Sequence, residues 1–289
     1  MLPTNKNDAI SMSQTATLGH AITLDTKMGQ SIGFWRGCSV ASTGCANCYS
    51  LFRILPRWYH MRPGQVIVNK QGSWNKPRHW KAPQMVFVCP LSDFFIDHPA
   101  VNKVRDKAWD VMRNYPQHIF WITTKRPELI EAKKMLPSDW PFPNIWLGVT
   151  TENQHWADKR MPILRNIQVH KDALRFVCAE PLLGPIQFAG PSTLDGYGWI
   201  TSGGESGDRK HLPRPAKDQW FLDIASQCTA AGVPFNLMQR GGIKKCRCHH
   251  DFGCRAIPPG PNGQVFESFP PQVQIISLHD DFPPMPPCP

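Results

Sequence analysis

Three cysteines stand close together near the start of the chain, at Cys38, Cys45 and Cys48. Their C-x6-C-x2-C spacing supplies three thiolates, whereas a fully ligated structural zinc or an electron-transfer cluster normally takes four protein ligands. A [4Fe–4S] cluster held by three thiolates keeps one iron available for a small molecule. The spacing therefore predicts a metal site at these cysteines that performs chemistry on a bound ligand.

Two other interpretations of the three cysteines stay open. They could bind zinc with a remote fourth ligand, or they could be core thiols without a metal. Disulfides are disfavoured. The polar segment Met1–Gln30 has no apolar core of the length that a secretory signal needs, so a reducing cytoplasmic location is expected.

The size and charge of the chain limit its class. Its 289 residues, 41% of them hydrophobic, can bury one large core, and a single α/β barrel routinely has about this length. No apolar stretch approaches the roughly 20 residues of a membrane span, so no membrane partner is expected. The net charge of +10 favours a polyanionic partner such as DNA or a nucleotide.

One segment, from Arg53 to Lys81, interleaves basic and aromatic residues. Cations for phosphates beside aromatic faces for unstacked bases are typical of proteins that hold single-stranded or flipped nucleotides. A solvated basic loop with its tryptophans turned inward is the alternative. The residues concerned are Arg53, Arg57, Trp58, Tyr59, His60, Arg62, Lys70, Trp74, Lys76, Arg78, His79, Trp80 and Lys81.

Short apolar runs alternate with helical stretches along most of the chain. The stretches Ala100–Asn114 and Ala216–Ala231 have helical spacing, and such an alternation predicts parallel strands joined by helices. An open doubly wound sheet is one arrangement. About six to seven strands favour a partial or full (β/α) barrel. The runs are 85–89, 118–122, 145–149, 174–178, 197–201 and 234–237, with a first strand near Ile32–Trp35.

Polar side chains follow these runs, where the loops of a parallel α/β fold build an active site. Helix capping or surface charge explains any one of these residues, but capping alone does not readily explain polar clusters at seven consecutive strand ends. The residues are the three cysteines, Ser92, Asp93, Thr123, Thr124, Lys125, Arg126, Thr150, Thr151, Glu152, Asn153, Glu180, Ser202, Gly203, Gly204, Glu205, Gln239 and Arg240.

Several of these stretches resemble the radical S-adenosylmethionine (SAM) enzymes, and more closely a phage-encoded radical-SAM-like family, over about residues 30 to 245. The usual radical SAM spacing is C-x3-C-x2-C, whereas here the first gap is six. The glycine-glycine-glutamate motif follows the sixth strand here and not the second. The motifs are Thr43-Gly-Cys-Ala-Asn-Cys-Tyr49, Val86-Phe-Val-Cys-Pro-Leu-Ser-Asp-Phe-Phe95, Ile122-Thr-Thr-Lys-Arg-Pro127, Trp146-Leu-Gly-Val-Thr-Thr-Glu-Asn153, Phe176-Val-Cys-Ala-Glu-Pro-Leu-Leu-Gly-Pro185 and Gly203-Gly-Glu-Ser-Gly207.

The resemblance implies a radical-SAM-type barrel over residues 31–245, after an N-terminal extension (1–30), with a [4Fe–4S] cluster on the three cysteines. By strand order, Ser92 and Asp93 take the amino-group role of the glycine-glycine-glutamate motif. Lys125 or Arg126 would meet the SAM carboxylate or a substrate phosphate. The resulting hypothesis makes Cys38, Cys45, Cys48, Lys125 and Glu180 catalytic, and makes Tyr49, Ser92, Asp93, Thr124, Glu152, Gly203, Gly204 and Glu205 cofactor-binding.

The implied activity is SAM cleavage to a 5′-deoxyadenosyl radical that modifies or isomerises a nucleobase substituent, such as a hypermodified thymine in phage DNA, within the host cytoplasm. An electron donor such as flavodoxin or ferredoxin is an expected partner. A photoproduct lyase that repairs DNA and a non-enzymatic zinc protein that binds nucleic acid are the alternatives.

The C-terminal segment, residues 246–289, contains a second group of possible ligands. Cys246, Cys248 and Cys254 lie beside two histidines and could form a small zinc or auxiliary iron–sulfur site, or only a basic loop. The proline-rich stretch from Pro258 to Pro289 is expected to be an extended tail.

Overall fold

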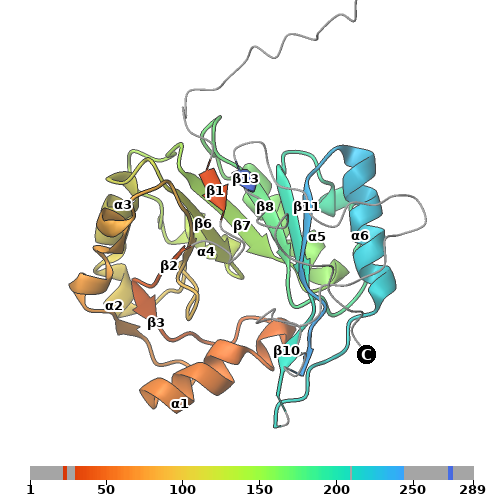
Figure 1. The fold of residues 1–289 in the computed structure, drawn as a ribbon, viewed down its shortest axis with the longest axis horizontal. Helices are drawn as coiled ribbons and strands as arrows, with labels where there is room; N and C mark the ends of the chain where they lie inside the picture. Colours follow the sequence, from red (N-terminus) through yellow and green to blue (C-terminus); the bar gives the residue numbers. More distant parts are fainter. Residues whose placement is uncertain (1–21, 25–29, 209, 244–272, 276–289) are drawn as a thin grey trace, which may run out of the picture.

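A seven-stranded parallel sheet forms the centre of the protein (Figure 1). The computed structural model describes residues 22–24, 30–208, 210–243 and 273–275. The strands are β2 (Gln30–Ile32), β5 (Met85–Val88), β6 (Ile119–Thr124), β7 (Ile145–Thr150), β8 (Arg175–Ala179), β9 (Trp199–Gly203) and β11 (Phe235–Gln239).

The order of the strands across the sheet is their order along the chain, from β2 at one edge to β11 at the other. Each connection therefore advances by one place in the same direction, which curls the sheet as in a barrel. Because β2 and β11 do not pair, the barrel stays open. The predicted α/β fold with six to seven parallel strands is confirmed, in its partial-barrel form.

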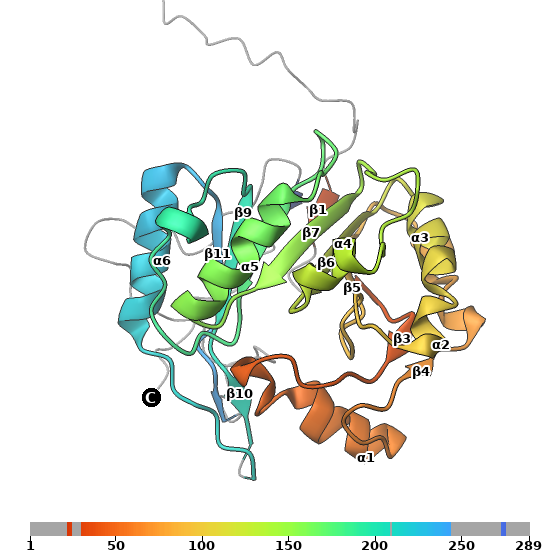
Figure 2. The same cartoon turned by 180° about the vertical axis from the view of Figure 1, so that it is seen from behind.

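Helices cover the convex face of this sheet, as Figure 2 shows from behind. Aliphatic side chains of the strands pack there against apolar side chains of the helices, such as Leu164 and Phe221. The covering helices are α3 (Arg105–Arg113), α4 (Pro127–Ala132), α5 (Gln154–Asn166) and α6 (Asp218–Ala231). No helix among the described residues is long and apolar enough to span a membrane.

The concave face carries an aromatic layer. The rings of Phe87 and Trp121 stack with centroids 4.5 Å apart, and Trp146, Phe176 and Trp199 lie in the same buried cluster. Gly148 is required beside them, because a Cβ at this position would lie 2.3 Å from the Phe176 ring. Aromatic side chains therefore fill the interior at the level of the strand centres.

Two predicted elements were wrong in their bounds. The first strand ends at Ile32 and not at Trp35, because the backbone carbonyls of Gly33 and Phe34 accept hydrogen bonds from Asn69 instead of pairing within the sheet. The predicted helix Ala100–Asn114 is interrupted between α2 (Pro99–Asn102) and α3. Just after the break, the buried Arg105 donates to the carbonyl of Ile96 at 2.6 Å, a tertiary contact that helical periodicity does not reveal.

Shorter elements complete the fold. The strand β1 pairs in parallel with β13, so a piece of the predicted N-terminal extension lies beside a piece of the predicted C-terminal segment. The bounds are β1 (Ile22–Leu24), β3 (Trp35–Arg36), β4 (Ile67–Val68), β10 (Ser206–Gly207), β12 (Gly242–Ile243), β13 (Val273–Ile275), α1 (Leu55–Tyr59), η1 (Thr43–Cys45), η2 (Ser50–Ile54), η3 (Gln71–Ser73), η4 (Lys76–His79) and η5 (Gly190–Ser192).

Candidate functional site

The cysteine loop, defined here as residues 38–48, bridges the two sides of the open barrel at the carboxyl ends of the strands. In both views the chain from β3 runs through this loop into η2 and α1 and reaches β10 (Figures 1 and 2). Ser92 Oγ donates to the Gly37 carbonyl at 2.5 Å on one side, and Asn47 Nδ2 donates to Glu205 at 2.9 Å on the other. The loop is thereby fixed at both of its ends.

The three predicted metal ligands lie together in this loop. Cys45 is buried, and Cys38 and Cys48 pack in the same apolar cluster, with Leu51 and Leu55. The pKa of Cys38 is raised to about 12, mainly by burial and also by the Asp93 carboxylate, while Arg126 opposes the shift. Burial also raises the pKa of Cys48, although hydrogen bonds from the backbone act to lower it. Without a metal, Cys38 and Cys48 are therefore thiols at neutral pH.

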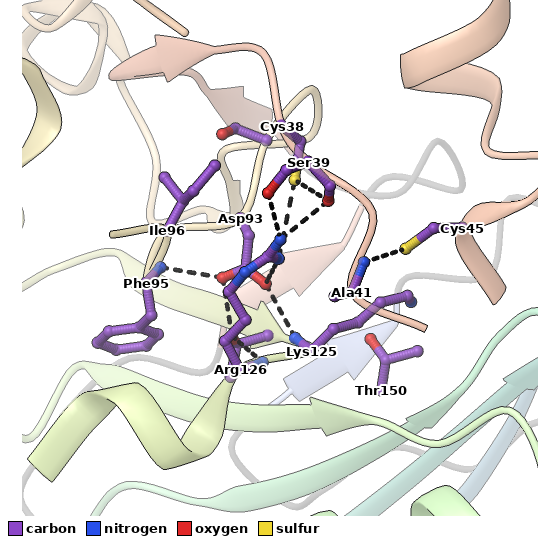
Figure 3. A network of polar contacts seen from close by, with 12 residues as sticks. Cys38, Ser39, Ala41, Cys45, Asp93, Phe95, Ile96, Lys125, Arg126 and Thr150 are labelled. Carbon is purple, nitrogen blue, oxygen red and sulfur yellow. Dashed lines mark hydrogen bonds and ion pairs between the residues drawn. The ribbon is translucent and has the colours of Figure 1, made fainter. Parts of the chain in front are cut away.

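A first ion pair holds the beginning of the loop (Figure 3). The guanidinium of Arg126 lies 3.3 Å from Asp93 Oδ2. It donates to the carbonyl oxygen of Ser39 at 2.9 Å and to the hydroxyl oxygen of Ser39 at 2.8 Å. It also reaches Cys38 Sγ at 3.9 Å. Asp93 in turn accepts from Thr124 Oγ1 at 2.7 Å and from the Lys125 backbone at 2.9 Å. The ends of β5 and β6 thus position the first cysteine.

A second ion pair supports the middle of the loop from below. Glu152, fully buried after β7, accepts from Arg160 of α5 at 2.9 Å and from the hydroxyl of Ser42. Lys125 Nζ approaches the same carboxylate to 3.5 Å. A Cβ at Gly44 would lie 2.5 Å from Glu152, so only glycine lets the loop pack onto this carboxylate.

A third ion pair holds the far end of the loop. Arg214 donates to Glu205 through its Nε at 2.9 Å and to the Thr43 carbonyl at 3.0 Å. Burial would raise the pKa of Glu205, but hydrogen bonds from Arg214 and Asn47 outweigh burial and keep this pKa below its ordinary value. Glu205 therefore stays ionised and keeps Asn47 and Arg214 in place.

Lys125, Glu180 and Tyr49 surround the concave side of the site. Burial raises the pKa of Glu180, while hydrogen bonding by Gln239 and the charge of Lys125 oppose the shift. Gln239 donates to this carboxylate at 2.5 Å. Tyr49 donates its hydroxyl to the Pro90 carbonyl at 2.8 Å. Glu180 is only half-buried, so it can meet a ligand.

The two glycines of the glycine-glycine-glutamate motif allow close packing around this carboxylate. A Cβ at Gly203 would lie 2.8 Å from the Glu180 carboxyl carbon, and one at Gly204 would lie 2.0 Å from the Arg240 carbonyl oxygen. In the structure, both positions make room for neighbouring groups of the protein.

All the predicted site residues lie at the carboxyl ends of the strands, but they form two groups. Lys125, Glu180 and Tyr49 face the concave side, whereas a second group supports the cysteine loop: Ser92, Asp93, Thr124, Glu152 and Glu205. Arg160 and Arg214 were missed. Arg160 could have been noticed, because it occupies a position in the apolar stripe of α5, with Ala157, Met161 and Leu164. No sequence signal marks Arg214 as a partner of the loop.

The described residues contain no group of three or more His, Cys, Asp or Glu side chains arranged to hold a metal ion. Cys38 Sγ donates to the Ser39 carbonyl at 3.4 Å, and Cys45 Sγ lies 3.5 Å from the Ala41 nitrogen. The three cysteine side chains lie in one apolar cluster, and thiolates are the ligands that iron–sulfur centres use. The predicted second site at Cys246, Cys248 and Cys254 lies outside the described residues.

The basic segment, defined here as residues 53–81, divides into inward and outward aromatic residues. Trp74 is 5% exposed, and its ring meets Phe34 edge-on, while Trp80 packs against the core. Trp58 is 69% exposed and Tyr59 is 40% exposed. The alternative of inward tryptophans therefore holds for Trp74 and Trp80 and fails for Trp58.

Comparison with known proteins gives one family. The family model described as "Protein of unknown function (DUF5131)" matches residues 28–270, most of the chain and the whole of the barrel. The chain belongs to this DUF5131 family. The match begins just before β2 and continues beyond the predicted end of the barrel at residue 245. Searches of curated proteins and of solved structures gave no match.

Proposed function

We propose that this DUF5131 protein is a radical SAM enzyme that modifies or isomerises a nucleobase substituent, with hypermodified thymine in DNA as the favoured target. The single observation that supports this most strongly is the placement of three thiols, on one loop held by three ion pairs, over the open end of a partial barrel. A purely structural zinc would not need to lie at this end of the barrel.

The loop residues fit an iron–sulfur cluster by their chemistry. Cys38, Cys45 and Cys48 would hold it, and their surroundings of Leu51 and Leu55 would limit its contact with water. When bound, a cluster of this kind with SAM supplies one electron to the sulfonium and yields a 5′-deoxyadenosyl radical. Asp93, Glu152 and Glu205 already accept hydrogen bonds from the protein and act as positioning residues for the loop.

Lys125 is the proposed binding cation of the site. Its side chain is 19% exposed and its ammonium group lies near Glu152, so it can meet a carboxylate or a phosphate from the concave side. Glu180, half-buried with a raised pKa, would accept a hydroxyl or an ammonium of the ligand. The aromatic layer below, around Trp121, would exclude water from the reacting carbon.

The test is anaerobic reconstitution with iron and sulfide, followed by metal analysis, visible spectroscopy and measurement of 5′-deoxyadenosine with SAM and dithionite. The wild type is compared with Cys45→Ala and with Cys228→Ala, which removes a buried thiol from α6, far from the loop in the fold. We expect a brown protein that forms 5′-deoxyadenosine in the wild type and in Cys228→Ala, and not in Cys45→Ala.

A colourless protein that retains zinc and never cleaves SAM would overturn the proposal in favour of a zinc protein that binds nucleic acid. SAM regenerated in every turnover on irradiated DNA would replace base modification with photoproduct repair. Flavodoxin or ferredoxin in place of dithionite then tests the proposed electron donor.

A further inference from the structure

The helix α1 lies in a part of the chain that combines positive charge with exposed aromatic side chains. From residue 26 to residue 92 the chain has nine Lys and Arg and no Asp or Glu, so this stretch contributes nine of the ten net positive charges. Among the described residues, one acidic side chain forms an ion pair with this stretch: Asp208, whose Oδ2 lies 4.0 Å from Arg53 Nη1. The remaining cations of the segment thus favour an anionic partner.

Aromatic rings stand beside these cations instead of being buried. The guanidinium of Arg57 lies 5.4 Å from the centre of the Trp58 ring, and that of Arg36 lies 4.3 Å from the Tyr59 ring. Trp58 is the most exposed of the large hydrophobic side chains in the described residues, at 69%. An exposed tryptophan with an adjacent arginine matches the surfaces on which proteins stack unpaired bases.

The position of this surface connects it to the site. The chain passes from Cys48 through η2 directly into α1, with the Phe52 nitrogen donating to the Cys48 carbonyl at 3.0 Å. The α1 surface therefore adjoins the segment that carries the cysteines, which crosses the open end of the barrel (Figure 1). A target base must leave a duplex to enter such a site.

We infer that the α1 surface, formed by Arg36, Arg57, Trp58, Tyr59 and Arg62, binds an unpaired strand of DNA, with Trp58 as a stacking platform. The inference deepens the proposed function, since it names the polymer that carries the target base and rests on that function for its use. Phosphates would contact the arginines, and bases would lie against the two exposed rings.

The experiment measures the fluorescence anisotropy of a labelled 15-mer of thymidine with the full chain, over a series of KCl concentrations. Trp58→Ala should weaken binding about tenfold, because base stacking on one aromatic residue carries an effect of that order, and Trp58→Phe should retain most of the affinity. Replacing Arg57 and Arg62 together with Ala should reduce the slope of log Kd against log salt by about 1.4.

Matched controls separate this surface from general basicity. Trp220→Phe and Lys217→Ala alter a second tryptophan with a nearby lysine, 5.8 Å from its ring, on α6. These variants should bind like the wild type, and labelled heparin, which has charge but no bases, should bind Trp58→Ala as well as the wild type. Circular dichroism confirms the folding of each variant.

Three results would overturn the inference: no binding of the 15-mer at low salt, equal affinity of Trp58→Ala and wild type, or tighter binding of a uridine 15-mer or of an acidic protein. Binding needs no cluster, so the measurement is made before reconstitution. Loss of DNA binding with intact SAM cleavage would refute the surface alone, and the reverse outcome would refute the proposed chemistry alone.

Discussion

The cysteine loop and the basic segment are neighbours in the chain, yet they use their charged surroundings in opposite ways. Around the cysteine loop, arginines from three other elements meet buried carboxylates, and each ion pair ends on the loop backbone or on a side chain of the loop. In the basic segment, most cations remain exposed. Charged side chains within the barrel therefore position the loop, whereas those outside the barrel remain available to a partner.

Removing the cation beneath the loop should have the greatest effect on the free energy of unfolding. Arg160→Met leaves the buried Glu152 carboxylate with only the Ser42 hydroxyl and the more distant Lys125, and should lower the free energy of unfolding by about 3–5 kcal/mol. Lys159→Met, at the adjacent exposed position of α5, should change it by less than about 0.5 kcal/mol. Urea unfolding measures both variants, and equal stabilities would show that the ion pair does not support the loop.

Trp74 and Trp58 lie in the same basic segment but differ in burial, so their removal should affect the stability of the protein differently. Trp74→Ala removes a core side chain and should cost about 3–4 kcal/mol. Trp58→Ala removes a mostly exposed side chain and should change the free energy of unfolding by less than about 0.5 kcal/mol. Thermal unfolding followed by circular dichroism compares the two. A large loss in Trp58→Ala would mean that Trp58 is part of the core and not a binding surface.

Two glycines give a smaller and cleaner contrast. Gly44→Ala places a methyl group against Glu152 and should destabilise the protein by about 1–3 kcal/mol, through overpacking beneath the loop. Gly72→Ala, in the basic segment, meets no atom within 4 Å and should cause no loss. Both are measured by urea unfolding. If Gly72→Ala proves the more damaging, the loop is less tightly packed than its contacts indicate.

The smallest expected effects depend on pH and distinguish Glu205 from Glu180. The pKa of Glu205 lies below its ordinary value of 4.5, so its stabilisation is complete above pH 4.5 and is lost as the pH falls through the folded pKa. Glu205→Gln should therefore cost about 1 kcal/mol at pH 7, since Arg214 is about a third exposed and solvent screens the pair, and the cost should disappear in acid.

Glu180 should behave in the opposite sense. Its pKa is raised by burial, so wild-type stability falls as the pH rises from 4.5 through the folded pKa. Glu180→Gln, which can still accept from Gln239, should be slightly more stable than wild type at pH 7 and equal to it in acid. Thermal unfolding across pH tests both variants, and parallel profiles for the two would contradict the assigned surroundings.

Much of the barrel was predictable because each strand is a short apolar run that is buried on both faces. Six of the seven strands lie where the runs predicted them, and the polar residues after them do gather at one end of the sheet. The end of β2 was not predictable, because Asn69 takes the hydrogen bonds of Gly33 and Phe34. Side-chain amides from distant positions leave no periodic signal.

The location of the candidate site residues was predictable from sequence, but the contacts that they make within the protein were not. Asp93, Glu152 and Glu205 were expected to bind a cofactor, yet in the structure each accepts hydrogen bonds from an arginine and from groups that hold the loop. A carboxylate at a strand end looks the same in sequence whether it meets a ligand or an arginine. The role of such a carboxylate depends on the group that pairs with it. Arg214 reaches Glu205 only because of the path that the chain takes after β10.

By itself, the sequence determined the parallel strands, the position of the cysteines after the first of them and the excess of positive charge, because these depend on local apolar runs and on residue identity. Only the tertiary structure decided which cations are paired and which aromatic side chains are exposed. Arg160 and Arg57 are both arginines on helices, but one lies beneath the loop against Glu152 and the other faces solvent beside Trp58. Burial depends on what packs against a side chain, and that comes from residues far away in the chain.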